Sequence, residues 1–178
     1  TDPETARKLL REFAVFYRRT LEDSADLIVF AREMEQTKRY FTFEVARFGA
    51  DRVEMEMRID PRVEDMLVPP FLLQPLVENA VRHAMPSEGK LTIEVTGEVT
   101  GNDVIVRVCD NGVGMTEEAR CNILHPESSL GLGIAVKNVH DRICGYFGPG
   151  THMEVESELG KGTCVILVLK EGALREYQ

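Results

Sequence analysis

Residues 68–83 read VPPFLLQPLVENAVRH, and this stretch decides how the rest of the chain is interpreted. Its apolar residues recur at helical spacing, and proline suits the first turn of a helix. We therefore expect a helix that follows Pro69-Pro70 and runs to about Ala84. Asn79 falls at the edge of the apolar arc, with His83 just inside it. An asparagine there can bond to nearby backbone, or its amide oxygen can ligate Mg²⁺.

Strands are predicted on both sides of this helix, because apolar and polar side chains alternate there. Working outward, the expected strands are residues 53–59, 91–96, 104–109, 152–158 and 163–169. The turn Thr100-Gly101-Asn102-Asp103 joins the second and third. A loop over 116–130 leads to a further helix over 131–143. Strands mixed with helices predict an α+β fold, a two-layer α/β sandwich with a mixed sheet packed on helices.

The first part of the chain is expected to be helical. Residues 9–21 and 27–48 form two apolar stripes with spacings of three and four, separated by polar residues. Such stripes suit either the seam of a dimer or a helical hairpin packed on its own domain. We therefore divide the chain into N-terminal helices (1–48), a second domain (49–172) and a C-terminal tail (173–178).

Composition excludes several classes of protein. The 178 residues are 43% hydrophobic and 29% charged, which is ordinary for a soluble globular chain. The 21 basic residues against 30 acidic residues give a net charge of -9, so nucleic acid is not an expected ligand. The four cysteines contain no CxxC pair, which argues against a zinc site or a dense disulfide framework and favours a reducing, cytoplasmic setting.

Three glycine-bearing segments depart from plain structural pattern. Residues 109–115 read CDNGVGM after a strand: Asp110 can accept a hydrogen bond from an exocyclic amine, and Met115 can pack on an aromatic ring, although an Asn-Gly hairpin is the alternative. Residues 128–133 read SSLGLG at a helix start, where backbone N–H groups can bind phosphate, or the glycines form a flexible joint. Residues 158–163 read ELGKGT, which alone is most simply a glycine hairpin.

Taken in order, these segments resemble the ATP-binding boxes of the GHKL (Bergerat-fold) superfamily. The matching positions are Asn79, Asp110-x-Gly112-x-Gly114, Gly131-x-Gly133 and Gly160-x-Gly-Thr163. Within that superfamily, residues 68–83 are similar to the LytS-type sensor histidine kinases of bacteria. Residues 46–49 (ARFG) and 133–143 (GIAVKNVHDRI) resemble the same group, so the likeness covers about residues 26–170.

The resemblance implies ATP and Mg²⁺ as ligands and a role for each matching residue. Asn79 would hold Mg²⁺ that bridges the ATP phosphates, and Asp110 would accept the adenine amino group. Gly112, Gly114 and Met115 would admit the base, with Thr163 supporting Asp110. The residues expected near the phosphates are Arg82, His83, Gly131, Leu132, Gly133 and Lys137, beneath a lid at about 116–130.

Kinases of this type phosphorylate a histidine upstream of the ATP-binding domain, and residues 1–82 contain no histidine. The resemblance therefore implies an acceptor before Thr1, dimerization through upstream helices, a response regulator as partner, and a cytoplasmic domain of a membrane-anchored receptor. Two other hypotheses stay open. One is an ATP hydrolase of the same fold, although Pro75 stands where such enzymes carry their water-activating glutamate. The other is a non-catalytic nucleotide-sensing module.

Overall fold

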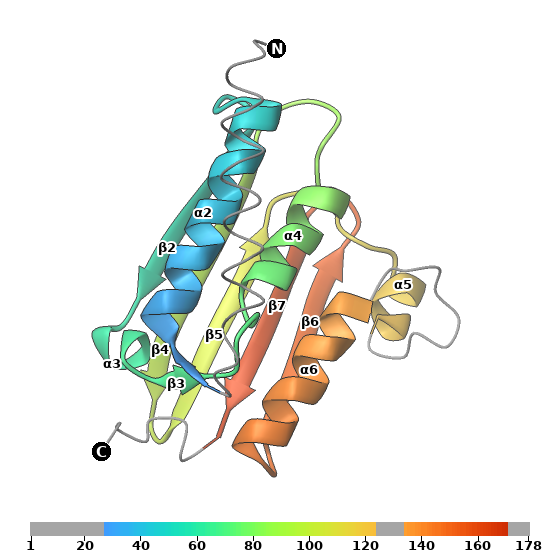
Figure 1. Ribbon diagram of the computed structural model, residues 1–178. Coiled ribbons are helices and arrows are strands. Elements are labelled where there is room, and N and C mark those ends of the chain that lie inside the picture. Colours follow the sequence, from blue (N-terminus) through green and yellow to red (C-terminus); the bar gives the residue numbers. More distant parts are fainter. Residues whose placement is uncertain (1–26, 124–133, 171–178) are drawn as a thin grey trace.

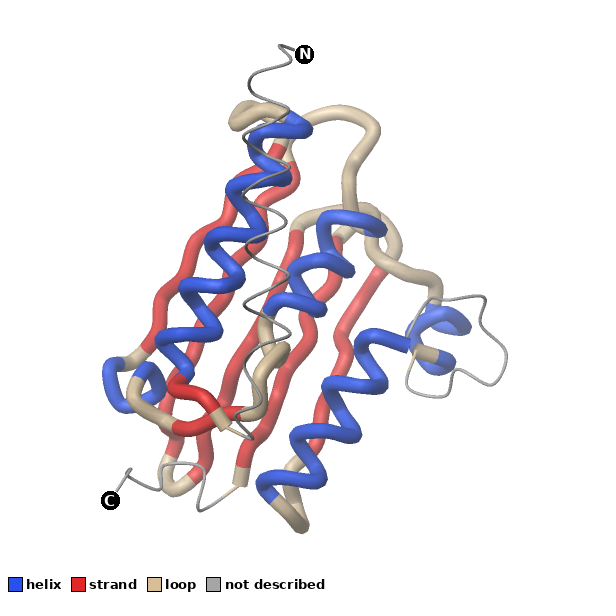
Figure 2. Tube along the Cα trace, viewed as in Figure 1, coloured by secondary structure: helices blue, strands red, loops and turns tan. Residues whose placement is uncertain are grey.

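The computed structural model describes residues 27–123 and 134–170 (Figure 1). Its main sheet has five strands in the order β2-β4-β5-β7-β6. These strands are β2 (Val53–Ile59), β4 (Leu91–Thr100), β5 (Asp103–Asp110), β6 (His152–Glu158) and β7 (Gly162–Leu169). One face of the sheet is covered by α2 (Phe30–Phe48), α4 (Gln74–His83) and α6 (Ile134–Phe147), as Figure 2 shows. The predicted two-layer α+β architecture is confirmed.

The strands pair in a mixed pattern. Strand β2 runs parallel to β4, and the other neighbouring pairs are antiparallel. Strands β4 and β5 form the predicted hairpin, in which Gly101 adopts a φ of 64° that favours glycine. Between β5 and β7 the register places Cys109 opposite Cys164 and Asp110 opposite Thr163. Two segments 53 residues apart therefore meet at one end of the sheet.

One hydrophobic core lies between the sheet and the helices. Alternate residues of β5, such as Val106 and Val108, are buried toward the helices. Phe30, Met34 and Phe41 of α2 belong to the same core. Helix α2 therefore shares one core with the sheet, and the domain border at residue 49 stays a prediction. No helix among the described residues is long and apolar enough to cross a membrane.

Two short features were not predicted, a pair of two-residue strands and a helix of one turn. Strand β1 (Ile28–Val29) pairs with β3 (Leu67–Val68), so the helix expected from residue 27 begins only at Phe30. The β-branched pair at 28 and 29 suits an extended backbone, and the Phe30 N–H donates to the Met66 carbonyl at 2.8 Å. The second is α3 (Pro61–Glu64), which the Asp60 side chain caps.

The start of α4 differs from the prediction. The helix begins at Gln74, with Pro75 in its first turn, and residues 69–73 form a loop. That loop is held by Glu33 of α2, a fully buried carboxylate that accepts hydrogen bonds from the N–H groups of Phe71 at 3.0 Å, Leu73 at 3.0 Å and Gln74 at 3.4 Å. Burial raises the pKa of Glu33, and these bonds oppose the rise. A buried carboxyl group therefore fixes the N-terminal end of α4 through hydrogen bonds to its backbone N–H groups.

The same loop is also tied to α6. The guanidinium of Arg142 donates to the carbonyl of Pro70 and, at 3.4 Å, to that of Phe71. Phe71 has a φ of 62°, which is unusual for a residue with a side chain. Contacts from two helices thus hold an unfavourable backbone conformation in place.

The predicted loop over 116–130 contains a helix. Thr116 caps α5 (Glu117–Asn122) by accepting a hydrogen bond from the Ala119 N–H at 3.3 Å, so a short helix opens the segment that was predicted as a loop. Residues 124–133 lie outside the described residues, and they include Gly131, Leu132 and Gly133 and most of the expected lid.

Candidate nucleotide-binding site

The site is built around Asp110, the last residue of β5. Its Oδ1 accepts hydrogen bonds from the backbone N–H groups of Gly112 at 2.9 Å and Thr163 at 3.3 Å. Its Oδ2 accepts none from the described residues. Half-burial raises the pKa of Asp110, and the two hydrogen bonds counteract it. The carboxylate is thus oriented by backbone groups and keeps one oxygen available for a donor outside the chain.

The turn after Asp110 packs against the end of α4. A Cβ atom on Gly112 would lie 2.0 Å from the Ala84 carbonyl oxygen, so only glycine fits there. The next residue, Val113, donates its N–H to the same oxygen at 3.1 Å. Asn79 is half-buried on the same helix. The Ala84 contact therefore joins the helix that carries Asn79 to the turn that carries Asp110.

Asn111 attaches the same turn to the start of β4. Its Oδ1 accepts from the Thr92 N–H at 2.7 Å, and its Nδ2 donates to the Lys90 carbonyl at 3.1 Å. This double contact uses both ends of the amide. The alternative of an Asn-Gly hairpin is excluded, because the chain continues from this turn into α5 and not into a returning strand.

Ser157 of β6 connects the remaining parts of the site. Its hydroxyl oxygen accepts from the Met115 N–H at 2.9 Å, donates to the Gly162 carbonyl at 2.9 Å, and lies 2.9 Å from the Thr163 hydroxyl. Sequence reasoning missed this residue. A signal existed, because the alternation of β6 places Ser157 on the same face as buried Val155.

The β6–β7 hairpin approaches the Asp110 turn closely. The Gly160 N–H donates to the Val113 carbonyl at 2.7 Å. Gly114 and Gly162 both have positive φ angles, of 65° and 91°, and a Cβ atom on either would lie 2.0 Å or less from a backbone oxygen. The glycines of the two segments therefore let two backbones meet at the end of the sheet.

The other predicted residues lie around this network. Arg82 and His83 lie in the last turn of α4 with most of their surface exposed, and partial desolvation of the imidazole and the Arg82 charge lower the pKa of His83. Lys137, on α6, pairs with Asp141. The structure brings together Asp110, Gly112, Gly114, Met115 and Thr163. It places Lys137 in an ion pair of its own, and residues 131–133 lie outside the described residues.

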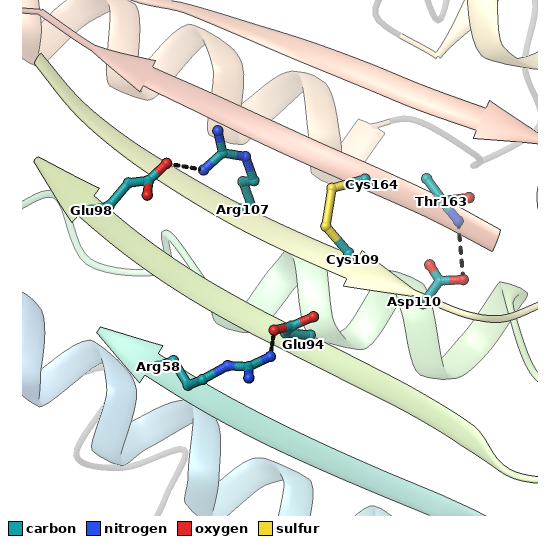
Figure 3. The surroundings of a disulfide bond; sticks show 8 residues. All are labelled: Arg58, Glu94, Glu98, Arg107, Cys109, Asp110, Thr163 and Cys164. Atoms are coloured by element: carbon teal, nitrogen blue, oxygen red, sulfur yellow. Dashed lines mark hydrogen bonds and ion pairs between the residues drawn. A yellow bond between two sulfur atoms is a disulfide. The ribbon is translucent and has the colours of Figure 1, made fainter. Parts of the chain in front are cut away.

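A disulfide between Cys109 and Cys164 joins β5 to β7 beside the site, as Figure 3 shows. The sequence contained no signal for it, because the two residues are 55 apart and only the sheet register places them opposite each other. Of the remaining cysteines, Cys121 is exposed and Cys144 is half-buried, and both are free thiols. No disulfide was predicted, because the cysteine pattern favoured a reducing setting.

This arrangement suits recognition of a planar amine-bearing ring. A carboxylate oxygen without a partner among the described residues is offered at the end of a strand, and the turn that follows carries the half-buried thioether of Met115. The glycines of this turn pack against other backbone, so the structure does not show them open to a base as the resemblance implied. Among the described residues, no group of three or more His, Cys, Asp or Glu side chains could hold a metal ion. A metal at this site would therefore need ligand atoms from a bound molecule as well.

Comparison with protein families gives two matches. Residues 71–173 match the model of histidine kinase-, DNA gyrase B- and HSP90-like ATPases. Residues 1–53 match a histidine kinase model. The first match covers more than half of the chain and includes the turn of Asp110 and all of the β6–β7 hairpin.

Curated relatives are similar along most of the chain. It is 37% identical to the sensor protein LytS of Bacillus cereus over 100% of its own length, and 36% identical to that of Bacillus subtilis over 92%. It is 34% identical to the sensor histidine kinase/phosphatase LytS of Staphylococcus aureus over 86%. The chain spans 31%, 28% and 27% of the lengths of these three relatives.

Solved structures agree on the fold. The catalytic domain of the histidine kinase ThkA matches with a TM-score of 0.63 at 18% identity, covering 83% of this chain and 99% of that one. The histidine kinase domain of a blue-light-activated kinase from Erythrobacter litoralis matches with a TM-score of 0.59 at 16% identity, covering 94% and 79%. At these identities the likeness concerns the fold alone.

Proposed function

Since this chain belongs to the histidine kinase-, DNA gyrase B- and HSP90-like ATPase family, we propose that it is the catalytic part of a LytS-type sensor histidine kinase. The family implies ATP binding. The proposed reaction transfers the γ-phosphate of ATP to a histidine. The observation that carries the proposal is the Asp110 carboxylate, whose Oδ1 is occupied by two backbone donors while Oδ2 faces none among the described residues.

In this proposal each side chain binds one part of the nucleotide. The Asp110 Oδ2 accepts the adenine amino group, and Thr163 keeps the carboxylate oriented through its N–H. Met115 packs beside the base. Residues toward the phosphates are Asn79, Arg82, His83, Lys137 and the segment 131–133.

Magnesium fits the residues present only together with ATP. The amide oxygen of Asn79 is a hard donor of the kind Mg²⁺ uses, and the described residues offer no acidic cluster to bind the ion alone. Asn79 would hold the ion, which would supply charge neutralisation at the phosphates. The fastening of α4 to the Asp110 turn through Ala84 supports a fixed spacing between the two ends of the nucleotide.

Phosphoryl transfer to an imidazole needs no water-activating base in this domain, because the imidazole is itself the nucleophile. Pro75 stands where family hydrolases carry their glutamate, and proline cannot accept a proton. The histidines among the described residues belong to elements of the folded domain itself: His83 to α4, His140 to α6 and His152 to β6. We propose an acceptor histidine outside the printed sequence, a response regulator that receives the phosphoryl group, dimerization through upstream helices, and membrane attachment only through other segments of the receptor.

Two substitutions test the nucleotide site. Asp110→Ala is expected to weaken ATP and ADP alike, because both carry adenine. Asn79→Ala is expected to weaken ATP only when Mg²⁺ is present. Each loss should be about 10- to 150-fold, since a hydrogen bond to a charged group contributes roughly 1.5–3 kcal/mol. Calorimetric titration with and without Mg²⁺ measures both effects.

The matched control for Asp110 is Asp103→Ala, at the opposite end of the same strand, where the carboxylate pairs with Lys170 at 2.7 Å. That variant should bind both nucleotides with unchanged affinity. Wild-type affinity in the Asp110→Ala variant would remove the assignment of the adenine contact.

A second experiment tests the reaction. With γ-labelled Mg-ATP the chain alone should stay unlabelled and release phosphate slowly. A longer receptor that carries an acceptor histidine, but has its own Asn79 equivalent replaced by alanine, should become labelled when the chain is added. The label should be acid-labile, as a phosphoramidate is.

The outcomes separate the three functions. Rapid phosphate release by the chain alone would identify a hydrolase. ATP binding with no transfer, in mixed dimers shown to form by cross-linking, would identify a sensing module. Transfer that is lost in the Asp110→Ala variant supports the kinase.

A further inference from the structure

The Cys109–Cys164 disulfide lies one residue from the proposed adenine contact on both strands. Cys109 precedes Asp110 at the end of β5, and Cys164 follows Thr163 at the start of β7. The sulfurs form the covalent link, and the next pair in the ladder forms the hydrogen bond from the Thr163 N–H to Asp110 (Figure 3). Any change in the spacing of these strand ends therefore reaches the site directly.

The disulfide and the site occupy opposite faces of the sheet. Successive strand residues alternate between faces, so Asp110 shares the face of buried Val108, and Cys109 shares the face of Arg107. Arg107 pairs there with Glu98, and no helix among the described residues covers this face. Both cysteines are only partly buried. The disulfide therefore lies on the face of the sheet away from the nucleotide site, at residues that are partly open to solvent.

The hydrogen bond beside the disulfide is the one most sensitive to strand spacing. The distance from Thr163 N to Asp110 Oδ1 is 3.3 Å, which is slightly longer than usual for an N–H···O bond. When a disulfide is reduced, the two sulfurs lose their bond and move apart to van der Waals contact. The covalent link between the two strand ends is then lost, and we expect the long bond from Thr163 to break before the shorter one from Gly112 at 2.9 Å.

We propose that Cys109–Cys164 is a redox-modification site, reduced by dithiols, whose reduction weakens adenine binding at Asp110. The inference rests on the proposed nucleotide site. One thiolate of the dithiol attacks a cysteine sulfur, forming a mixed disulfide, and the other cysteine leaves as a thiolate that takes up a proton. The second thiol of the reductant then displaces the first cysteine. The chain gains two thiols, and the dithiol becomes a disulfide.

The experiment compares oxidised and reduced protein in a Cys121→Ser/Cys144→Ser background, so that only this pair reacts. Alkylation followed by mass spectrometry reports the state of the pair, and circular dichroism reports the fold. Reduction by dithiothreitol is expected to weaken ATP and ADP about 3- to 10-fold, as the loss of one supporting hydrogen bond would. Reoxidation should restore the affinity.

A Cys109→Ser/Cys164→Ser variant should bind like the reduced protein and ignore dithiothreitol. If it fails to fold, the redox cycle of the unsubstituted pair still decides the question. Equal affinity in the two states, or two free thiols without any reductant, would overturn the redox site while leaving the nucleotide site intact. An oxidised chain that binds no nucleotide would overturn both proposals.

Discussion

Gly162→Ala is expected to eliminate measurable nucleotide binding and to lower the free energy of unfolding by roughly 2–5 kcal/mol. The new Cβ atom would lie 1.9 Å from the backbone oxygen of Asp110, at a φ of 91° that side chains rarely adopt. Neither the Gly162 backbone nor the Asp110 backbone can move away without breaking the β5–β7 ladder at the end that carries Asp110. Urea unfolding and calorimetry measure the two losses.

Gly160→Ala is the matched control, in the same hairpin. Its φ of 81° carries a similar conformational cost, but nothing lies within 4 Å of its Cβ position. We expect a loss of about 1–2 kcal/mol in stability and near-normal ATP affinity. If the two variants behave alike, backbone strain and not the approach to Asp110 explains the effect, and the close contact has no special importance.

Glu33→Ala is expected to lower the free energy of unfolding by about 3 kcal/mol or more, because each buried N–H left without an acceptor costs about 1–3 kcal/mol. Three such groups, on Phe71, Leu73 and Gln74, depend on this carboxylate. Glu33→Gln should cost less, since its amide oxygen can still accept. Glu35→Ala, on the exposed side of α2, should change stability by less than about 1 kcal/mol.

The pH dependence of the Glu33 variants has a defined sign. Burial raises the pKa of Glu33 in the folded state above its usual 4.5, so the folded protein holds this proton more tightly than the unfolded chain does. The stability of the wild type relative to Glu33→Gln is therefore greatest at low pH and declines as the pH rises through the folded pKa. A difference that grows with pH would contradict this account of the buried carboxylate.

Local patterns predicted the strands and the position of Asp110 well. Alternation of apolar residues marked β2, β4 and β5, and Asp110 was expected directly after a strand, although the turn that follows it could also have been an Asn-Gly hairpin. The start of α4 was wrong, because the Pro69-Pro70 pair looks like a first turn until Glu33, far away in sequence, binds the loop that follows. Local sequence cannot report such a partner.

Ser157 and the disulfide were missed for a related reason. Both act through the register of β6, β7 and β5, which pairs residues distant in sequence. A serine in a strand is unremarkable until Met115 and Thr163 are placed beside it. Only the folded structure shows where each partner lies. The roles of Asn79 and Lys137 in binding a nucleotide stay predictions.

The strand that completes the sheet is the last to be synthesised. Strand β7 lies between β5 and β6, so β6 reaches the rest of the sheet only through a segment that leaves the ribosome after it. Until then Asp110 lacks its Thr163 partner and Ser157 has no hairpin to join, while the edge of β5 stays open to other strands. A chain that ends before residue 163 would hold most of the proposed site residues and bind nothing with them.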